Sequence, residues 1–154
     1  MIAGKAVCFA EAMTDKFIND QKQTIKNAKI LAQTLLDNEI KLITGGTDIH
    51  LILIDCISLN ITGKEAALAL EQAGIYTNFN TIPFDPRPAN DPSGLRLGTP
   101  ALTTQGMKEP QMQQIGQIIA KILKKPDDEN LKSQAKELVK NLTHQFPIYQ
   151  NLEY

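Results

Sequence analysis

The sequence predicts an α/β fold, a two-layer α/β sandwich in which helices pack on a small, mostly antiparallel sheet. Apolar residues recur at three, four and seven residue spacings in several segments, as they do in amphipathic helices. Short apolar runs bounded by glycine or proline lie between these segments and are typical of strands. The resulting order is helix, helix, strand, strand, helix, strand, strand, helix, helix, which suits this architecture.

The first two helices are expected over residues 2–10 and 15–38. Residues 2–10 are small and apolar almost all round, which is typical of a helix packed on several sides. A chain that begins inside such a helix is expected to be truncated. Residues 15–38 carry an apolar stripe with lysine and glutamine between its members, which predicts an amphipathic helix.

Two strands and a third helix are expected next. Residues 41–44 are predicted to form a strand that ends at a glycine turn. Residues 50–55 are predicted to form a strand covered on both faces, because their apolar side chains do not alternate. Thr62 and Glu65 have the spacing of a capping box, so a short helix is expected over 63–73.

Two further strands, at residues 75–79 and 95–97, flank a loop that contains four prolines. Repeated prolines exclude a helix or a central strand there. Loops of this length without internal structure are uncommon and often bind a ligand. Residues 80–94 are therefore a candidate binding segment.

Two helices are expected to end the fold, one from Pro110 to about Lys124 and one that Pro147 stops. A length of 154 residues suits one domain over 1–154. Hydrophobic residues make up 42% and charged residues 21%, which is typical of globular proteins rather than disordered ones.

The charge distribution and the cysteines narrow the class of protein. Net charge is -1, without a block of lysine or arginine, so neither nucleic acid nor an anionic membrane is expected as a partner. The longest apolar run, residues 51–54, is too short to cross a bilayer, and no targeting signal is visible. Cys8 and Cys56 lack metal-ligand spacing and are expected to be free thiols in a reducing cytoplasm.

No nucleophile with its base, carboxylate pair or metal-ligand cluster is visible, so no catalytic residue is expected in this chain. Arg96 is the candidate binding residue, because strand alternation places Leu95 and Leu97 on one face and the guanidinium on the other. A guanidinium can hold a carboxylate with two parallel hydrogen bonds. An arginine on a solvated sheet face is the alternative, but the adjacent proline-rich loop favours an anion site.

Five blocks of the sequence resemble serine hydroxymethyltransferase, in family order and at similar spacing. They are Gly45-Gly46-Thr47-Asp48, His50-Leu51, Leu59-Asn60-Ile61-Thr62-Gly63-Lys64-Glu65-Ala66, Asn80-Thr81-Ile82-Pro83-Phe84-Asp85-Pro86-Arg87 and Ser93-Gly94-Leu95-Arg96-Leu97-Gly98-Thr99-Pro100. The resemblance covers essentially the whole chain.

The resemblance implies the C-terminal small domain of a pyridoxal-phosphate enzyme of fold type I, the aspartate-aminotransferase type. That family moves the hydroxymethyl group of serine to tetrahydrofolate and leaves glycine. The resemblance implies that Arg96 binds the amino-acid carboxylate, that Asn80 lies close to the folate, and that Pro88, Ala89 and Asn90 belong to the loop that also contacts folate.

The resemblance also implies that the residues that bind the cofactor lie outside this chain. The cofactor lysine of the family lies in a threonine-rich segment ahead of this region, and no lysine here has that context; Lys64 belongs to the first turn of a capped helix. The chain alone is therefore expected to be inactive. Its expected partners are the large cofactor-binding domain of the same enzyme and further copies in a homo-oligomer. A freestanding carboxylate-binding module, or a scaffold for subunit contacts through residues 2–10, is the alternative.

Overall fold

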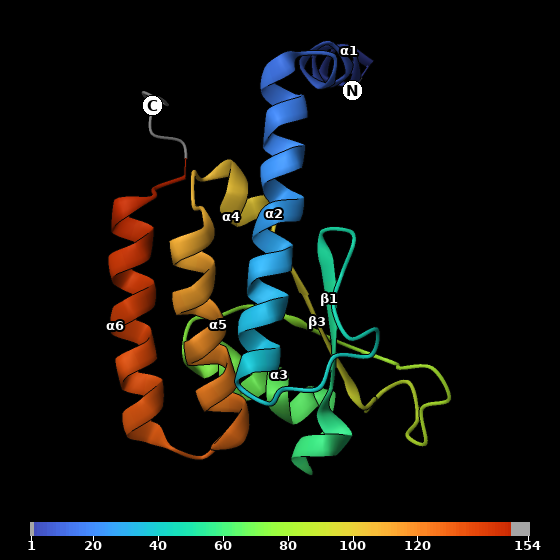
Figure 1. Ribbon diagram of the computed structural model, residues 1–154, viewed down its shortest axis with the longest axis vertical. Coiled ribbons are helices and arrows are strands. Elements are labelled where there is room, and N and C mark those ends of the chain that lie inside the picture. The colour runs from blue at the N-terminus through green and yellow to red at the C-terminus, as the bar shows by residue number, and fades with distance from the viewer. Residues whose placement is uncertain (1, 149–154) are drawn as a thin grey trace.

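The computed structural model describes residues 2–148 and confirms the α/β class, with helices on one side of a small antiparallel sheet (Figure 1). The elements in chain order are α1 (Ile2–Ala12), α2 (Asp15–Asp37), β1 (Leu51–Asp55), the 3-10 helix η1 (Cys56–Leu59), α3 (Gly63–Gln72), β2 (Asn78–Asn80), β3 (Gly94–Gly98), α4 (Pro100–Thr104), α5 (Glu109–Lys124) and α6 (Glu129–Gln145). Within the described range, no helix is long and apolar enough to span a membrane.

The sheet has the strand order β1-β3-β2, and both pairs are antiparallel. Its central strand, β3, pairs Arg96 with Leu53 of β1 on one side and with Asn78 of β2 on the other. Because directly paired residues project from the same face of a sheet, these three side chains form one row across it.

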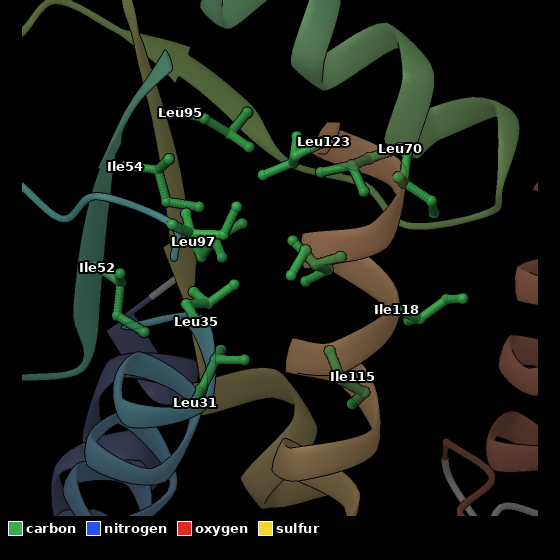
Figure 2. Close-up of a cluster of buried hydrophobic side chains, with 14 of the residues drawn as sticks. Leu31, Leu35, Ile52, Ile54, Leu70, Leu95, Leu97, Ile115, Ile118 and Leu123 are labelled. Atoms are coloured by element: carbon green, nitrogen blue, oxygen red, sulfur yellow. The ribbon is translucent and has the colours of Figure 1, made fainter. Parts of the chain in front are cut away.

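The core lies between one face of the sheet and the helices α2 and α5. The buried side chains on the sheet side are Ile52, Ile54, Leu95 and Leu97. Figure 2 shows them facing Leu31 and Leu35 of α2 and Leu123 of α5. Burial of this apolar surface is the main stabilising contribution to the domain.

Two glycines allow the backbone of β3 to approach its neighbours closely. An ideal Cβ at Gly94 would lie 2.5 Å from the carbonyl oxygen of Asn80 and 2.6 Å from Cγ2 of Ile82. A Cβ at Gly63 would overlap the carbonyl oxygen of Gly94. These positions let β2 and the start of α3 pack directly against the first residue of β3.

Local sequence signals placed most helices correctly. The predicted capping box is present: the Thr62 N–H donates to Glu65 Oε2 at 2.7 Å, and the Glu65 N–H donates to Thr62 Oγ1 at 3.0 Å. The helices expected over 15–38, 63–73 and from Pro110 to Lys124 are confirmed within a residue or two, as is the last helix. The short helix α4, which Pro100 begins, was not predicted.

Two of the predicted strands differ from the strands in the structure. Residues 41–44 form only a single bridge, between Leu42 and Ile54, because the chain turns at once and the Gly45 N–H bonds the Leu42 carbonyl. The strand predicted at 75–79 is instead Asn78–Asn80, because the Ile75 N–H bonds the Leu70 carbonyl at the end of α3.

The coverage of β1 and α1 also differs from expectation. Strand β1 is covered on one face only: Ile52 and Ile54 are buried, whereas Leu51 and Leu53 are half-buried. Helix α1 has no buried residue and projects from the end of α2 (Figure 1), so nothing in the described chain packs around it. The expectation of packing on several sides is wrong for this chain by itself.

Candidate functional site

Arg96 lies in the middle of β3 with its side chain on the open face of the sheet. The neighbouring Leu95 and Leu97 are 0% and 6% exposed, whereas Arg96 is exposed, which confirms the alternation predicted from the sequence. No hydrogen bond or ion pair within residues 2–148 involves its guanidinium. The group is therefore available to an external anion.

Asn80 lies on the same open face as Arg96. It follows Asn78 by two residues on β2 and pairs with Gly94, two residues before Arg96 on β3. Arg96 and Asn80 both line a hollow of about 590 Å³. The structure thus brings together two of the residues that the sequence singled out.

The turn between residues 44 and 49 forms another wall of this hollow. Thr47 fixes its shape: Thr47 Oγ1 donates to the Leu51 carbonyl at 2.6 Å and accepts the Ile49 N–H at 3.2 Å. Gly45 has a φ of 67°, a left-handed conformation that glycine adopts without strain. Reasoning from side-chain chemistry missed this wall, although the block Gly45-Gly46-Thr47-Asp48 was the signal that could have found it.

The proline-rich loop between β2 and β3 is organised by one carboxylate. Asp85 accepts hydrogen bonds from the backbone N–H groups of Ile82, Arg87 and Ser93 and from Ser93 Oγ, at 2.7 to 3.1 Å. Desolvation opposes ionisation of Asp85, but these bonds, led by those from Ser93, hold its pKa well below the usual range. Asp85 is therefore ionised at neutral pH, where it can accept all four bonds.

Arg87 belongs to this loop rather than to the hollow. Its guanidinium pairs with the Asp91 carboxylate, and its Nε donates to the Asp91 carbonyl at 3.0 Å. The hydrogen bond from Arg87 lowers the pKa of Asp91. Arg87 thus has an internal carboxylate partner, whereas Arg96 has none among the described residues.

Pro88, Ala89 and Asn90 lie at the exposed tip of the same loop. They do not line the hollow that Arg96 and Asn80 share. Within the described chain, the structure therefore does not bring the predicted folate loop together with Asn80.

Other groups that could do chemistry have structural surroundings. Desolvation, helped by the Asp55 carboxylate, raises the pKa of the buried Cys56 thiol to about 12, so Cys56 stays protonated and a poor nucleophile. In the described part of the chain, no group of three or more His, Cys, Asp or Glu side chains could hold a metal ion. No lysine among residues 2–148 lines the Arg96 hollow.

Comparison with known proteins matches this chain to one family. Residues 1–119 match the family model described as serine hydroxymethyltransferase. The serine hydroxymethyltransferase of Prochlorococcus marinus (strain MIT 9301) is 48% identical over 151 residues, which is 98% of this chain and 36% of that protein. The enzyme of the same name from Koribacter versatilis (strain Ellin345) is 48% identical over 97% of the chain and 35% of its own length.

A third relative extends the match over the full sequence. The serine hydroxymethyltransferase of Endomicrobium trichonymphae is 47% identical over 154 residues, which is 100% of this chain and 37% of that protein. The chain thus spans little more than a third of the length of the curated relatives that it matches.

Proposed function

The chain belongs to the serine hydroxymethyltransferase family, and on that premise we propose that residues 1–154 are the C-terminal small domain of a glycine hydroxymethyltransferase. The full enzyme is a transferase that interconverts serine and glycine with tetrahydrofolate and pyridoxal phosphate, and we place it in the cytoplasm. Its large domain is the partner of this chain, and the assembled enzyme is a homo-oligomer.

Arg96 binds the substrate carboxylate in this proposal. The observation that carries it is the exposed guanidinium on the open sheet face, beside a hollow and without an internal partner in the described chain. Two parallel charge-assisted hydrogen bonds would fix both the position and the plane of the carboxylate. The amino acid would then be anchored at one end while the cofactor acts on the other.

Asn80 and the loop tip of Pro88, Ala89 and Asn90 contact the folate in this proposal. Asn80 lines the same hollow as Arg96, so its amide can reach a molecule bound beside the amino acid. The loop tip is exposed but held in shape by Asp85 and by the Arg87–Asp91 pair. It can therefore meet a folate that the large domain holds.

The residues of this chain do not by themselves fit pyridoxal phosphate. The hollow at Arg96 offers no lysine amine to attach the cofactor, and the capping-box helix leaves Lys64 exposed. We therefore assign both cofactor binding and the catalytic steps to the large domain. The 154-residue chain alone is inactive in this proposal, because the cofactor supplies the chemistry.

A chimeric enzyme tests the assignment. The 151 residues of the Prochlorococcus marinus enzyme that match this chain are replaced by the chain itself, and serine cleavage with tetrahydrofolate is measured. We expect a chimera that loads pyridoxal phosphate and cleaves serine. A folded, cofactor-loaded chimera without serine cleavage would contradict the proposal.

Self-association is a second candidate function, favoured by α1. Ile2, Val7, Phe9 and Met13 are 59% to 87% exposed on and just after this helix, and the helix has no buried residue. Exposed apolar clusters of this kind mark interaction surfaces. We expect the chain to sediment as an oligomer at high concentration and Phe9→Asp to shift it towards monomer; a strictly monomeric wild type would rule the role out.

A further inference from the structure

A second cavity, of about 390 Å³, lies between α5, α6 and the segment 74–77. Its walls are largely apolar, and the side chains that form the apolar part include Leu31, Leu102, Ile115, Ile118, Leu138 and Leu142. Figure 2 shows Ile118 pointing away from the sheet, on the opposite side of α5 from the main core. Part of the cavity therefore lies beyond α5, although Leu31, Leu97 and Ile119 of the core also line it.

The mouth of this cavity is polar because β2 is short. β2 pairs with β3 only as far as Arg96, so Leu97 and Gly98 have no strand partner on that side and line the cavity instead. Thr77 Oγ1 is buried there without a hydrogen-bond partner in the described structure. Buried polar atoms in folded proteins usually have a partner, so this hydroxyl is an exception in the segment that borders the cavity.

Arg96 supplies the charge at the mouth. A neighbouring space of about 360 Å³ shares Tyr76, Thr77 and residues 96–98 with the cavity. Among the residues of the described range 2–148 that line either space, only Arg96 is charged. A ligand that fills the apolar part and carries one negative charge at its end would satisfy both regions.

We propose that this cavity binds a monocarboxylate with an unbranched apolar tail. Its volume and its apolar walls with a few polar groups at one end are typical of small-molecule sites. The tail would displace water from the space between α5 and α6, and the carboxylate would lie at Arg96. This site is distinct from the Asn80 hollow of the proposed function, although a carboxylate in either space would compete for the same guanidinium.

Octanoate is the probe, with 1-octanol as its uncharged counterpart, and calorimetry on the 154-residue chain measures binding. We expect saturable binding of octanoate at one site per chain. Arg96→Gln should weaken octanoate binding about tenfold, as loss of a charge-assisted hydrogen bond predicts, and leave 1-octanol binding unchanged. Absence of saturable octanoate binding, or an equal effect of Arg96→Gln on both probes, would overturn the proposal.

A variant that fills the cavity tests its location. Val139 lines the cavity from α6, so Val139→Trp should abolish binding of both probes. Asn141→Trp is the matched control, since Asn141 is exposed on the same helix. This variant should leave binding unchanged. If Val139→Trp does not unfold cooperatively on heating, Leu138→Phe is used in its place, because it adds less volume to the cavity at the neighbouring position. Octanoate binding that a folded cavity variant leaves intact would show that the ligand lies elsewhere.

Discussion

Substituting Gly94 by alanine should loosen the sheet at the point that holds Asn80 beside Arg96. The added Cβ would lie 2.5 Å from the Asn80 carbonyl oxygen, 2.6 Å from Ile82 Cγ2 and 3.1 Å from Leu53 Cδ1. The first of these atoms belongs to the backbone of β2, so the strand itself must shift. Overpacking of this kind costs about 1 to 3 kcal/mol. Because a backbone atom is involved, we expect the upper end, about 3 kcal/mol.

Urea denaturation followed by circular dichroism measures this cost. With an m-value of about 2 kcal/mol/M, a loss of about 3 kcal/mol lowers the midpoint by about 1.5 M. Gly98→Ala is the matched control on the same strand, because its Cβ would meet no atom closer than 3.5 Å. A Gly94→Ala midpoint that matches those of wild type and Gly98→Ala would refute the close approach of β2 to β3.

Two further predictions concern the cofactor and the pH dependence of stability. When the isolated chain is mixed with pyridoxal phosphate, borohydride should not fix the cofactor to any single lysine, because no described lysine lines the hollow. Absorbance and peptide mapping after reduction measure this. One uniquely labelled lysine would contradict the prediction. The hydrogen bond from Lys26 lowers the pKa of Glu109 from 4.5 to about 2, so the Lys26–Glu109 pair should stabilise the fold above pH 4.5 and cease to do so as pH falls towards 2. Glu109→Gln should therefore lower the urea midpoint at pH 7 but not at pH 2, and an equal effect at both would exclude the pair.

Features fixed by neighbouring residues could be predicted from the sequence. The capping box of Thr62 and Glu65 depends on residues three apart, and it begins α3 where expected. The exposure of Arg96 follows from its place between two buried leucines on one strand. Local patterns of this kind determine the direction of a side chain before any tertiary contact is known.

Features that depend on residues far apart in the chain could not be predicted from the sequence. The turn containing Thr47 reaches Arg96 only because β1 pairs with β3, a contact between segments far apart in the chain. The strand predicted from Ile75 starts three residues later, because the end of α3 keeps the Ile75 N–H as a hydrogen-bond donor. The apolar pattern of residues 2–10 predicted a packed helix, but a pattern does not say whether the covering surface lies in the same chain.

The role of Arg96 is tested most directly by kcat/KM for serine in the chimeric enzyme carrying Arg96→Lys. Lysine keeps the charge but loses the planar pair of donors, so the carboxylate would be held by a point charge on a flexible stem. Losing a charge-assisted hydrogen bond costs about 1.5 to 3 kcal/mol, so kcat/KM should fall about tenfold to a hundredfold, with cofactor absorbance unchanged. Arg87→Lys, in the loop and away from the hollow, should be milder. Full kcat/KM for serine in Arg96→Lys would contradict the carboxylate role and leave Arg96 as a solvated residue on an open sheet face.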